Sequence, residues 1–218
     1  MVYHVLNRPN GRLKLFKKDD DFKAFEQVLA LLIERVPMRI LGLCIMSNHW
    51  HLVLWPREDG ELTAFMRQLT LTHAQRWKHA HNAVGHGPLY QGRFKSFPIQ
   101  EGEHLLTLLR YVEHNPVRVG MVKRAEEWPW SNLAVRRAAR HDLKPLLADW
   151  PIDRPVNWNR LVNKPQTAAE EKAITLHLTR GRPFGDAAWV AQTARQLNLQ
   201  STLRSRGRQE GWRKRRPV

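Results

Sequence analysis

The chain of 218 residues carries a formal net charge of +16, and 42% of its residues are hydrophobic, as expected of a globular protein with one core and an appendage. It contains no apolar stretch near the roughly 18 residues that span a bilayer, and the first residues show no signal-peptide pattern. The single cysteine, Cys44, excludes a disulfide and a cysteine-based zinc site within one chain. We therefore expect a cytoplasmic, nucleoid-associated protein with no membrane partner.

The positive charge is concentrated toward the C-terminal end. Residues 151–218 contain 14 Lys or Arg against 5 Asp or Glu, whereas residues 1–150 contain 22 against 15. A basic chain binds polyanions, because neutralising phosphates releases condensed counterions. A membrane surface is the competing partner, but no basic amphipathic helix with a large apolar face is visible. The balance favours nucleic acid.

Apolar periodicity predicts alternating strands and helices in the first half of the chain. Strands are expected over residues 1–7, 38–46, 49–55 and 90–99, and helices over 22–36, 62–79 and 103–114. Three aspartates at 19–21 favour the first helix start, Pro37 ends that helix, and Asn115-Pro116 is expected to end the third. This βαββαβα order predicts an α+β, ferredoxin-like fold, with a four-stranded antiparallel sheet and helices on one face.

Two histidines stand two residues apart at the start of the third predicted strand. Because strand side chains alternate between faces, His49 and His51 project from the same face, while Trp50 points into packing on the other. Their imidazoles can converge on one divalent cation, which then needs at least one further ligand. The competing interpretation is a pair of polar strand residues that face water. On the fourth strand, Arg93 and Lys95 are expected to share one face and to orient phosphates.

The third predicted helix carries a tyrosine and an asparagine four residues apart. Tyr111 and Asn115 therefore point from the same side of that helix, where they can supply a nucleophile and a third metal ligand. A phenol with an ordinary pKa near 10 is a poor nucleophile, but a phosphate held by a divalent cation becomes electrophilic enough for attack. The alternative is a packed tyrosine followed by a helix-capping asparagine.

The chain after residue 132 changes character. Residues 133–165 are expected to form a basic, Pro- and Trp-rich wrap or linker. Residues 166–218 are expected to form a basic helical tail, with helices near 168–178 and 187–197. A helix-turn-helix is one interpretation, although two helices joined by a turn are far commoner. Arg180 and Arg182 lie in an Arg-Gly-Arg-Pro sequence that matches a minor-groove hook or a tight solvated turn. Residues 204–216 hold seven basic residues and are expected to be disordered until they meet phosphate.

Several motifs, in this order and spacing, resemble the single-tyrosine HUH transposases, and among them the REP-associated tyrosine transposases. They span roughly residues 3–132 and comprise Tyr3-His4-Val5, Met46-Ser47-Asn48-His49-Trp50-His51-Leu52-Val53, Tyr90-Gln91-Gly92-Arg93-Phe94-Lys95-Ser96, Arg110-Tyr111-Val112-Glu113-His114-Asn115-Pro116-Val117-Arg118 and Glu127-Trp128-Pro129-Trp130-Ser131.

The resemblance implies a ferredoxin-like catalytic domain in which His49 and His51 bind Mg²⁺ or Mn²⁺ and Tyr111 attacks single-stranded DNA. Attack leaves a 5′-phosphotyrosine and a free 3′-hydroxyl, and strand transfer later resolves the covalent joint. Insertion-sequence relatives use a glutamine as the third ligand, where this chain has Asn115, so the site is expected to close through the shorter amide or through water. Relatives also begin the first strand several residues earlier, so that strand is expected to be shortened here.

The leading hypothesis is thus a metal-dependent DNA nickase and strand transferase that acts on single-stranded DNA flanking hairpins. Its catalytic domain is expected over residues 1–132, with DNA contacts from Arg93, Lys95, Arg118, Arg180 and Arg182. The alternative from a different class is a domesticated DNA- or RNA-binding protein with the same fold and no turnover. A third hypothesis is a metal phosphodiesterase that uses water instead of tyrosine.

Overall fold

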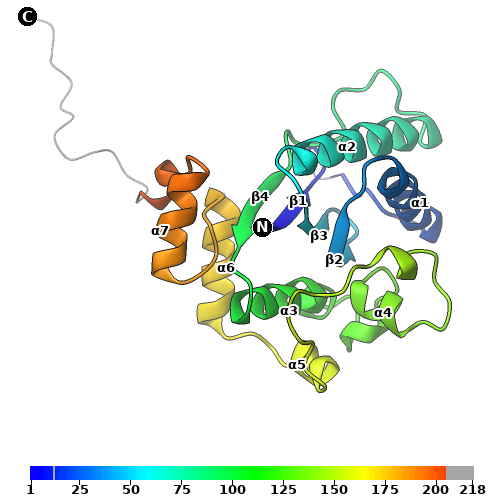
Figure 1. Ribbon diagram of the computed structural model, residues 1–218. Coiled ribbons are helices and arrows are strands. Elements are labelled where there is room, and N and C mark those ends of the chain that lie inside the picture. The colour runs from blue at the N-terminus through cyan, green and yellow to red at the C-terminus, as the bar shows by residue number, and fades with distance from the viewer. Residues whose placement is uncertain (12, 205–218) are drawn as a thin grey trace, which may run out of the picture.

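A four-stranded antiparallel sheet in the order β2-β3-β1-β4 forms the centre of the computed structural model, which describes residues 1–11 and 13–204 (Figure 1). The strands are β1 (Val2–Asn7), β2 (Arg39–Ile45), β3 (Trp50–Trp55) and β4 (Lys95–Ile99). With α1 (Asp19–Arg35), α2 (Glu61–Ala80) and α3 (Glu103–Arg118) they follow the predicted βαββαβα order. The α+β class and the antiparallel sheet are confirmed, whereas most of residues 204–216 lies outside the described chain.

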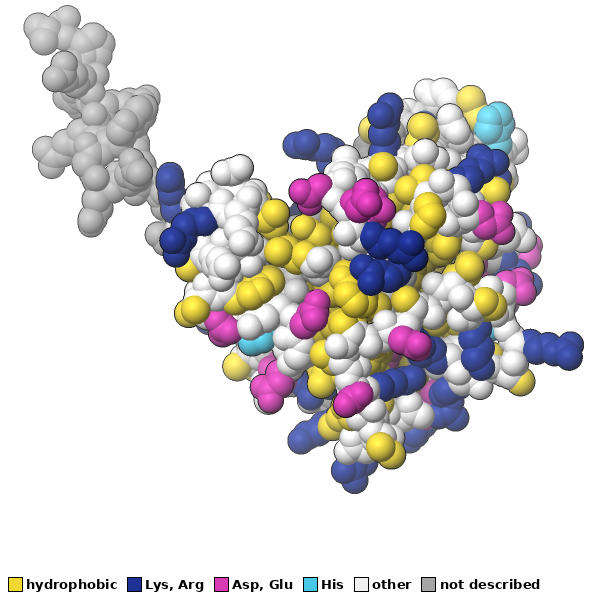
Figure 2. All heavy atoms as spheres, viewed as in Figure 1, with side chains coloured by type: hydrophobic (Ala, Val, Ile, Leu, Met, Phe, Trp, Pro, Cys, Tyr) yellow, Lys and Arg dark blue, Asp and Glu magenta, His cyan; other side chains and the backbone are white. Residues whose placement is uncertain are grey.

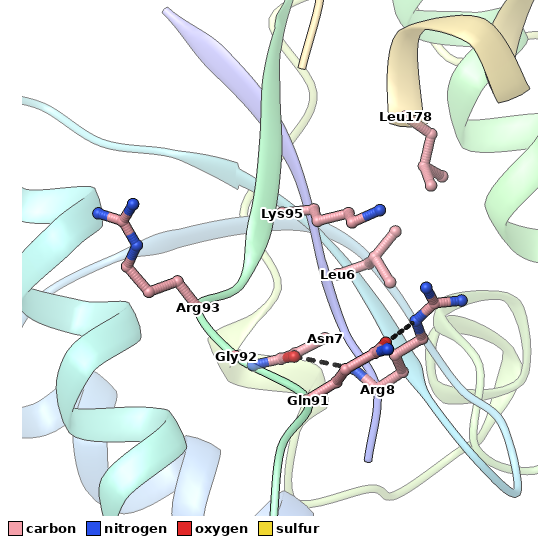
Figure 3. Close-up of a pocket in the computed structure, with 8 residues that line it drawn as sticks. All are labelled: Leu6, Asn7, Arg8, Gln91, Gly92, Arg93, Lys95 and Leu178. Atoms are coloured by element: carbon pink, nitrogen blue, oxygen red, sulfur yellow. Dashed lines mark hydrogen bonds between the residues drawn. The ribbon is translucent and has the colours of Figure 1, made fainter. Parts of the chain in front are cut away.

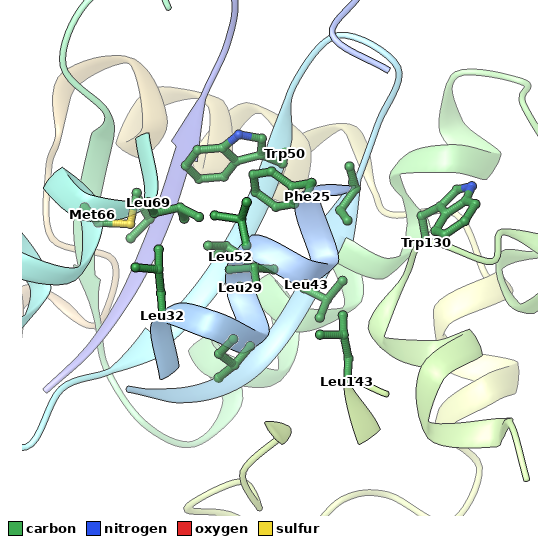
Figure 4. Close-up of a cluster of buried hydrophobic side chains, with 14 of the residues drawn as sticks. Phe25, Leu29, Leu32, Leu43, Trp50, Leu52, Met66, Leu69, Trp130 and Leu143 are labelled. Atoms are coloured by element: carbon green, nitrogen blue, oxygen red, sulfur yellow. The ribbon is translucent and has the colours of Figure 1, made fainter. Parts of the chain in front are cut away.

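The prediction that all helices cover one face of the sheet is wrong. Trp50, Leu52 and Leu54 of β3 pack in a core with α1 and α2 (Figure 4), whereas Val53 packs in a second core with Leu109 of α3. A Cβ on Gly42 of β2 would lie only 2.7 Å from Leu109, so the helix sits directly on the sheet. Both faces are apolar, and an apolar face must be buried against another element, so the sheet is covered on both sides.

Two element boundaries also differ from the prediction. Strand β4 begins at Lys95 rather than at Tyr90, which forms only an isolated bridge to Pro9. Tyr90 is buried, and its hydroxyl lies 2.6 Å from His73 Nδ1 and accepts a hydrogen bond from Trp50. Helix α3 runs on through Pro116 to Arg118, because residues 113–116 are buried and this packing outweighs the hydrogen bond that proline removes.

The C-terminal segment packs closely on the sheet and on α3. It contains α4 (Asn132–Arg137), α5 (Trp158–Asn163), α6 (Ala168–Arg180) and α7 (Ala187–Gln196), with short 3₁₀ turns at Ala125–Glu127, Lys144–Leu146 and Gln200–Leu203. The Trp150 indole donates to the carbonyl of Leu41, and Phe184 exchanges backbone hydrogen bonds with Pro98 and Gln100 at the edge of β4. None of the helices in the described chain is long and apolar enough to cross a membrane.

Candidate catalytic site

The two predicted histidines meet at the start of β3, on the face of the sheet that α3 covers. His49 immediately precedes the strand, and its Nε2 lies 2.9 Å from Nε2 of His51, which is only 2% exposed. Nitrogens at two neighbouring positions of an octahedral cation, bonded at about 2.0–2.1 Å, are about 2.9 Å apart. The imidazole pair therefore fits a small divalent cation.

Burial keeps both imidazoles neutral. It lowers the pKa of His49 to about 4, with smaller effects from the nearby charges of Arg118 and Arg8. Burial also holds the pKa of His51 well below its usual range, and His49 and His4 add to this effect. Neutral imidazoles keep the lone pairs that a metal needs. The described residues contain no group of three or more His, Cys, Asp or Glu side chains that could hold a metal.

A third histidine, which the sequence did not single out for a role, contacts the ring nitrogen of His51 that does not face His49. His4 on β1 is fully buried, and its Nε2 lies 2.9 Å from Nδ1 of His51. If His51 uses Nε2 for a metal, its proton sits on Nδ1 and is donated to His4. Such a partner fixes the tautomer and the ring orientation of a metal-bound histidine. Only its place opposite β3 in the sheet, with His4 paired to Val53, reveals this relationship.

Tyr111 faces the histidines from α3. Its ring stands perpendicular to that of His51, with the ring centroids 6.1 Å apart, and 7% of the residue remains exposed. Burial raises the pKa of Tyr111, the charge of Arg118 opposes this, and Glu171 of α6 adds to it. The phenol is therefore protonated at neutral pH, and a cation close to it favours its ionised form.

Asn115 and Arg118 lie on the same side of α3 as Tyr111, one and two turns further along. The guanidinium of Arg118 donates to the Asn115 side-chain oxygen at 2.6 Å, and its carbon lies 5.3 Å from the centre of the Tyr111 ring. The Asn115 amide nitrogen donates to the carbonyl of Tyr111, and the residue is fully buried. An amide oxygen has two lone pairs, so one remains after the bond from Arg118.

A basic hollow of about 340 Å³ lies between the end of β1 and the start of β4 (Figure 3). Its lining includes Arg8, Arg93 and Lys95, and also Leu6, the residue that pairs with His51 across the sheet. The predicted common face of Arg93 and Lys95 is wrong, because Arg93 precedes β4 and extends to the opposite side from Lys95 in Figure 3. Arg8, whose Nε donates to Gln91 at 2.7 Å, was not predicted, since a turn arginine has no distinctive pattern.

The remaining predicted DNA contacts lie elsewhere. Arg180 is in the last turn of α6 and donates to the carbonyl of Arg204, and Gly181 ends the helix in the left-handed conformation at φ 67°. The carbonyl of Arg182 faces Nδ1 of His177 at 3.0 Å. These arginines belong to a helix-ending turn and are not brought to the histidine pair.

Comparisons with known proteins give a consistent result. Residues 1–115 match the family of IS200-like transposases. A Haemophilus influenzae protein named as a REP-associated tyrosine transposase is 27% identical over 140 residues, which cover 60% of this chain and 77% of that protein. The solved structure of a REP-associated tyrosine transposase bound to a REP hairpin is similar in fold, with a TM-score of 0.53 and 18% identity over 77% of this chain and 89% of that one.

Proposed function

The chain belongs to the family of IS200-like transposases, and on this premise we propose that it cleaves and rejoins single-stranded DNA beside hairpins, with Tyr111 as the nucleophile. The observation that carries the proposal is the position of Tyr111, whose ring faces a convergent pair of neutral imidazoles across one gap. Tyr3 and Tyr90, the other two tyrosines of the chain, have no such neighbours: Tyr3 packs against the core with α1 and α2, and Tyr90 is held by His73 and Trp50.

In the proposed reaction the phenol oxygen of Tyr111 attacks a backbone phosphorus. The new bond joins this oxygen to phosphorus, and the bond from phosphorus to the 3′-oxygen breaks. The phenol proton is released to water, and the departing 3′-oxygen takes up a proton to become a free hydroxyl. The 5′-phosphate stays on the tyrosine until a second 3′-hydroxyl attacks it, which reverses the step and joins two strands.

His49 and His51 would hold a Mg²⁺ or Mn²⁺ ion, with the second lone pair of the Asn115 oxygen, directly or through water, as the third protein ligand. When bound, this ion polarises the phosphate and stabilises the negative charge that develops on it. His4 would keep Nε2 of His51 free for the ion, because Nε2 of His4 accepts a hydrogen bond from the protonated Nδ1 of His51 in that tautomer.

Arg118 is the residue best placed to neutralise the scissile phosphate, since it is exposed and lies beside both Tyr111 and Asn115. Arg8, Arg93 and Lys95 would bind the phosphates of the adjoining single strand in the basic hollow. The similar protein solved with a REP hairpin suggests the same class of DNA here. We assign the chemistry to residues 1–132, a structural wrap to residues 133–165, and DNA affinity, including contacts from Arg180 and Arg182, to residues 166–218.

Incubation with end-labelled hairpin DNA that carries single-stranded flanks, in Mn²⁺, tests the proposal. A protein–DNA adduct that survives a denaturing gel in the wild type, and is absent from the Tyr111→Phe variant, is the expected result. Cleavage that forms no adduct, and that persists in the Tyr111→Phe variant, would indicate a water-dependent phosphodiesterase. Tight binding with no cleavage in any metal would indicate a binding protein without turnover.

A further inference from the structure

Three arginines surround a second hollow, on the side of α3 that carries Glu113 rather than Tyr111. The hollow has a volume of about 340 Å³ and is lined by Arg136 and Arg137 of α4, by Arg154 and by Trp158 and Asn159 of α5. Residues 111 and 113 of a helix point in nearly opposite directions, and Glu113, two residues after Tyr111, accepts hydrogen bonds from Trp158 and from Asn132. Helix α3 therefore separates this hollow from the candidate catalytic site.

The charge of this hollow is not neutralised by its lining. No carboxylate lines it, and none of the three arginines forms an ion pair within the described chain. Two acids act electrostatically on Arg136: Glu113, whose two oxygens accept hydrogen bonds from Trp158 and Asn132, and Asp149, which is exposed and does not line the hollow. Figure 2 shows Lys and Arg side chains gathered in the lower part of the molecule, where α4 and α5 lie in Figure 1.

Arg136 is the fixed part of this arrangement. One of its terminal nitrogens donates to the carbonyl of Ala148 at 2.6 Å, while its Nε is buried and has no partner in the described chain. A buried donor without a partner destabilises the fold, because its hydrogen bond to water is lost and not replaced. Like-charged Arg154 lies close enough that it adds to burial in lowering the pKa of Arg136. An anion in the hollow would relieve both the repulsion and the missing hydrogen bond.

The lining selects the kind of anion. Guanidinium groups present several N–H donors in one plane and match the oxygens of a phosphate in a bidentate manner. Arg137 and Arg154 are exposed, and the Arg154 guanidinium lies 5.3 Å from the centre of the Trp150 ring, a cation–π contact that orients it. The apolar rim at Val156 is fully exposed, so the hollow is open to a large ligand.

We propose that Arg136, Arg137 and Arg154 form a second phosphate-binding site, which holds a backbone phosphate of the bound DNA away from the cleaved strand. The choice of DNA as the source of the phosphate rests on the proposed function, whereas the affinity for phosphate does not. A DNA molecule held at both sites is fixed in orientation relative to α3, which a single groove cannot achieve.

The test compares the full-length Arg137→Gln/Arg154→Gln double variant with the wild type, and uses Arg160→Gln as the matched control. Arg160 is an exposed arginine of α5 that does not line the hollow. Binding of labelled hairpin DNA is followed by fluorescence anisotropy over a salt series in EDTA, so that the outcome does not depend on whether the chain cleaves DNA. The double variant is expected to bind about tenfold more weakly at low salt, with a slope flattened by about 0.7–0.9 for each lost contact. The control should match the wild type.

A second measurement separates DNA from free phosphate as the source. Inorganic phosphate is titrated into protein with ¹⁵N-labelled arginine, against chloride of equal ionic strength, and the Arg136 Nε signal is expected to shift only with phosphate. Equal DNA affinities and slopes in the double variant, the control and the wild type would overturn the assignment to DNA. A phosphate shift in that case would leave free phosphate as the ligand, and no shift would remove the site altogether.

Discussion

The ring of Tyr111 stands at 90° to the ring of His51, although the two residues come from a helix and a strand that are far apart in the sequence. The packing of α3 on the second face of the sheet creates this relationship, since Leu109 of the helix and Val53 of the strand share one buried core. The proposed nucleophile and the proposed metal-binding pair are thereby held next to each other.

Replacing Tyr111 by phenylalanine removes one oxygen and leaves the ring packing in place. We expect the covalent DNA adduct to disappear while hairpin affinity changes less than about twofold, because the phenol oxygen is needed for the reaction and not for binding. Denaturing gels and anisotropy measure the two quantities. Tyr3→Phe, at a half-buried tyrosine on the other face of the sheet, is the matched control and should keep the adduct.

Loss of either imidazole should remove metal binding. Calorimetry with Mn²⁺ is expected to give a measurable affinity for the wild type and none for His49→Ala or His51→Ala, because one histidine and one amide are too few ligands. His86→Ala, at an exposed histidine, should bind like the wild type. Unchanged Mn²⁺ affinity in both site variants would falsify the metal assignment.

The third-ligand role of Asn115 predicts a graded response. Asn115→Ala should cleave slowly and recover at high Mn²⁺, whereas Asn115→Gln should stay active because it keeps an amide oxygen. The Asn115 oxygen also accepts a hydrogen bond from Arg118 at 2.6 Å, and the Arg118→Gln variant tests this second role separately from metal binding. Loss that metal does not rescue in both Asn115 variants, with a lowered unfolding temperature, would instead assign Asn115 to the stability of α3.

His4 should tune the metal site without touching the metal. His4→Leu removes the partner of His51 Nδ1, and partners of this kind are worth about 10- to 100-fold in metal affinity. His4→Gln, which retains a side-chain acceptor, should recover part of the loss. Mn²⁺ titration is the readout, and circular dichroism checks that both variants fold. Equal Mn²⁺ affinity of the Leu and Gln variants would argue for packing alone.

Glu26 on α1 predicts a pH dependence of stability. Burial, and then the nearby Asp142, raises the pKa of this carboxyl from 4.5 to about 7. Because this pKa is raised in the folded chain, the contribution of protonated Glu26 to the free energy of unfolding is fully present below pH 4.5. It is lost as the pH rises through 7. Glu26→Gln should therefore match the wild type at pH 4 and be more stable at pH 8, by up to about 3 kcal/mol. Urea unfolding at both pH values measures the difference, and an equal difference at both would contradict the titration.

The sequence alone predicted the order of strands and helices and the shared side of the two histidines. It also predicted that Tyr111 and Asn115 share one side of a helix. These features depend only on the periods of two residues in a strand and 3.6 residues in a helix. The same local patterns placed helix starts well, as for the helix expected near 187–197, since α7 begins at Ala187. The motifs likewise indicated the family, because they are read from the sequence and do not depend on tertiary contacts.

Only the tertiary structure decided which elements meet. The face that α3 covers, the support of His51 by His4 and the Arg8 side of the basic hollow all join residues that are distant in the chain, and no local period specifies such pairs. The continuation of α3 through Pro116 has the same origin. Proline is unfavourable in an isolated helix, but burial of residues 113–116 against the rest of the protein outweighs that local preference and carries the helix on to Arg118, beside Tyr111.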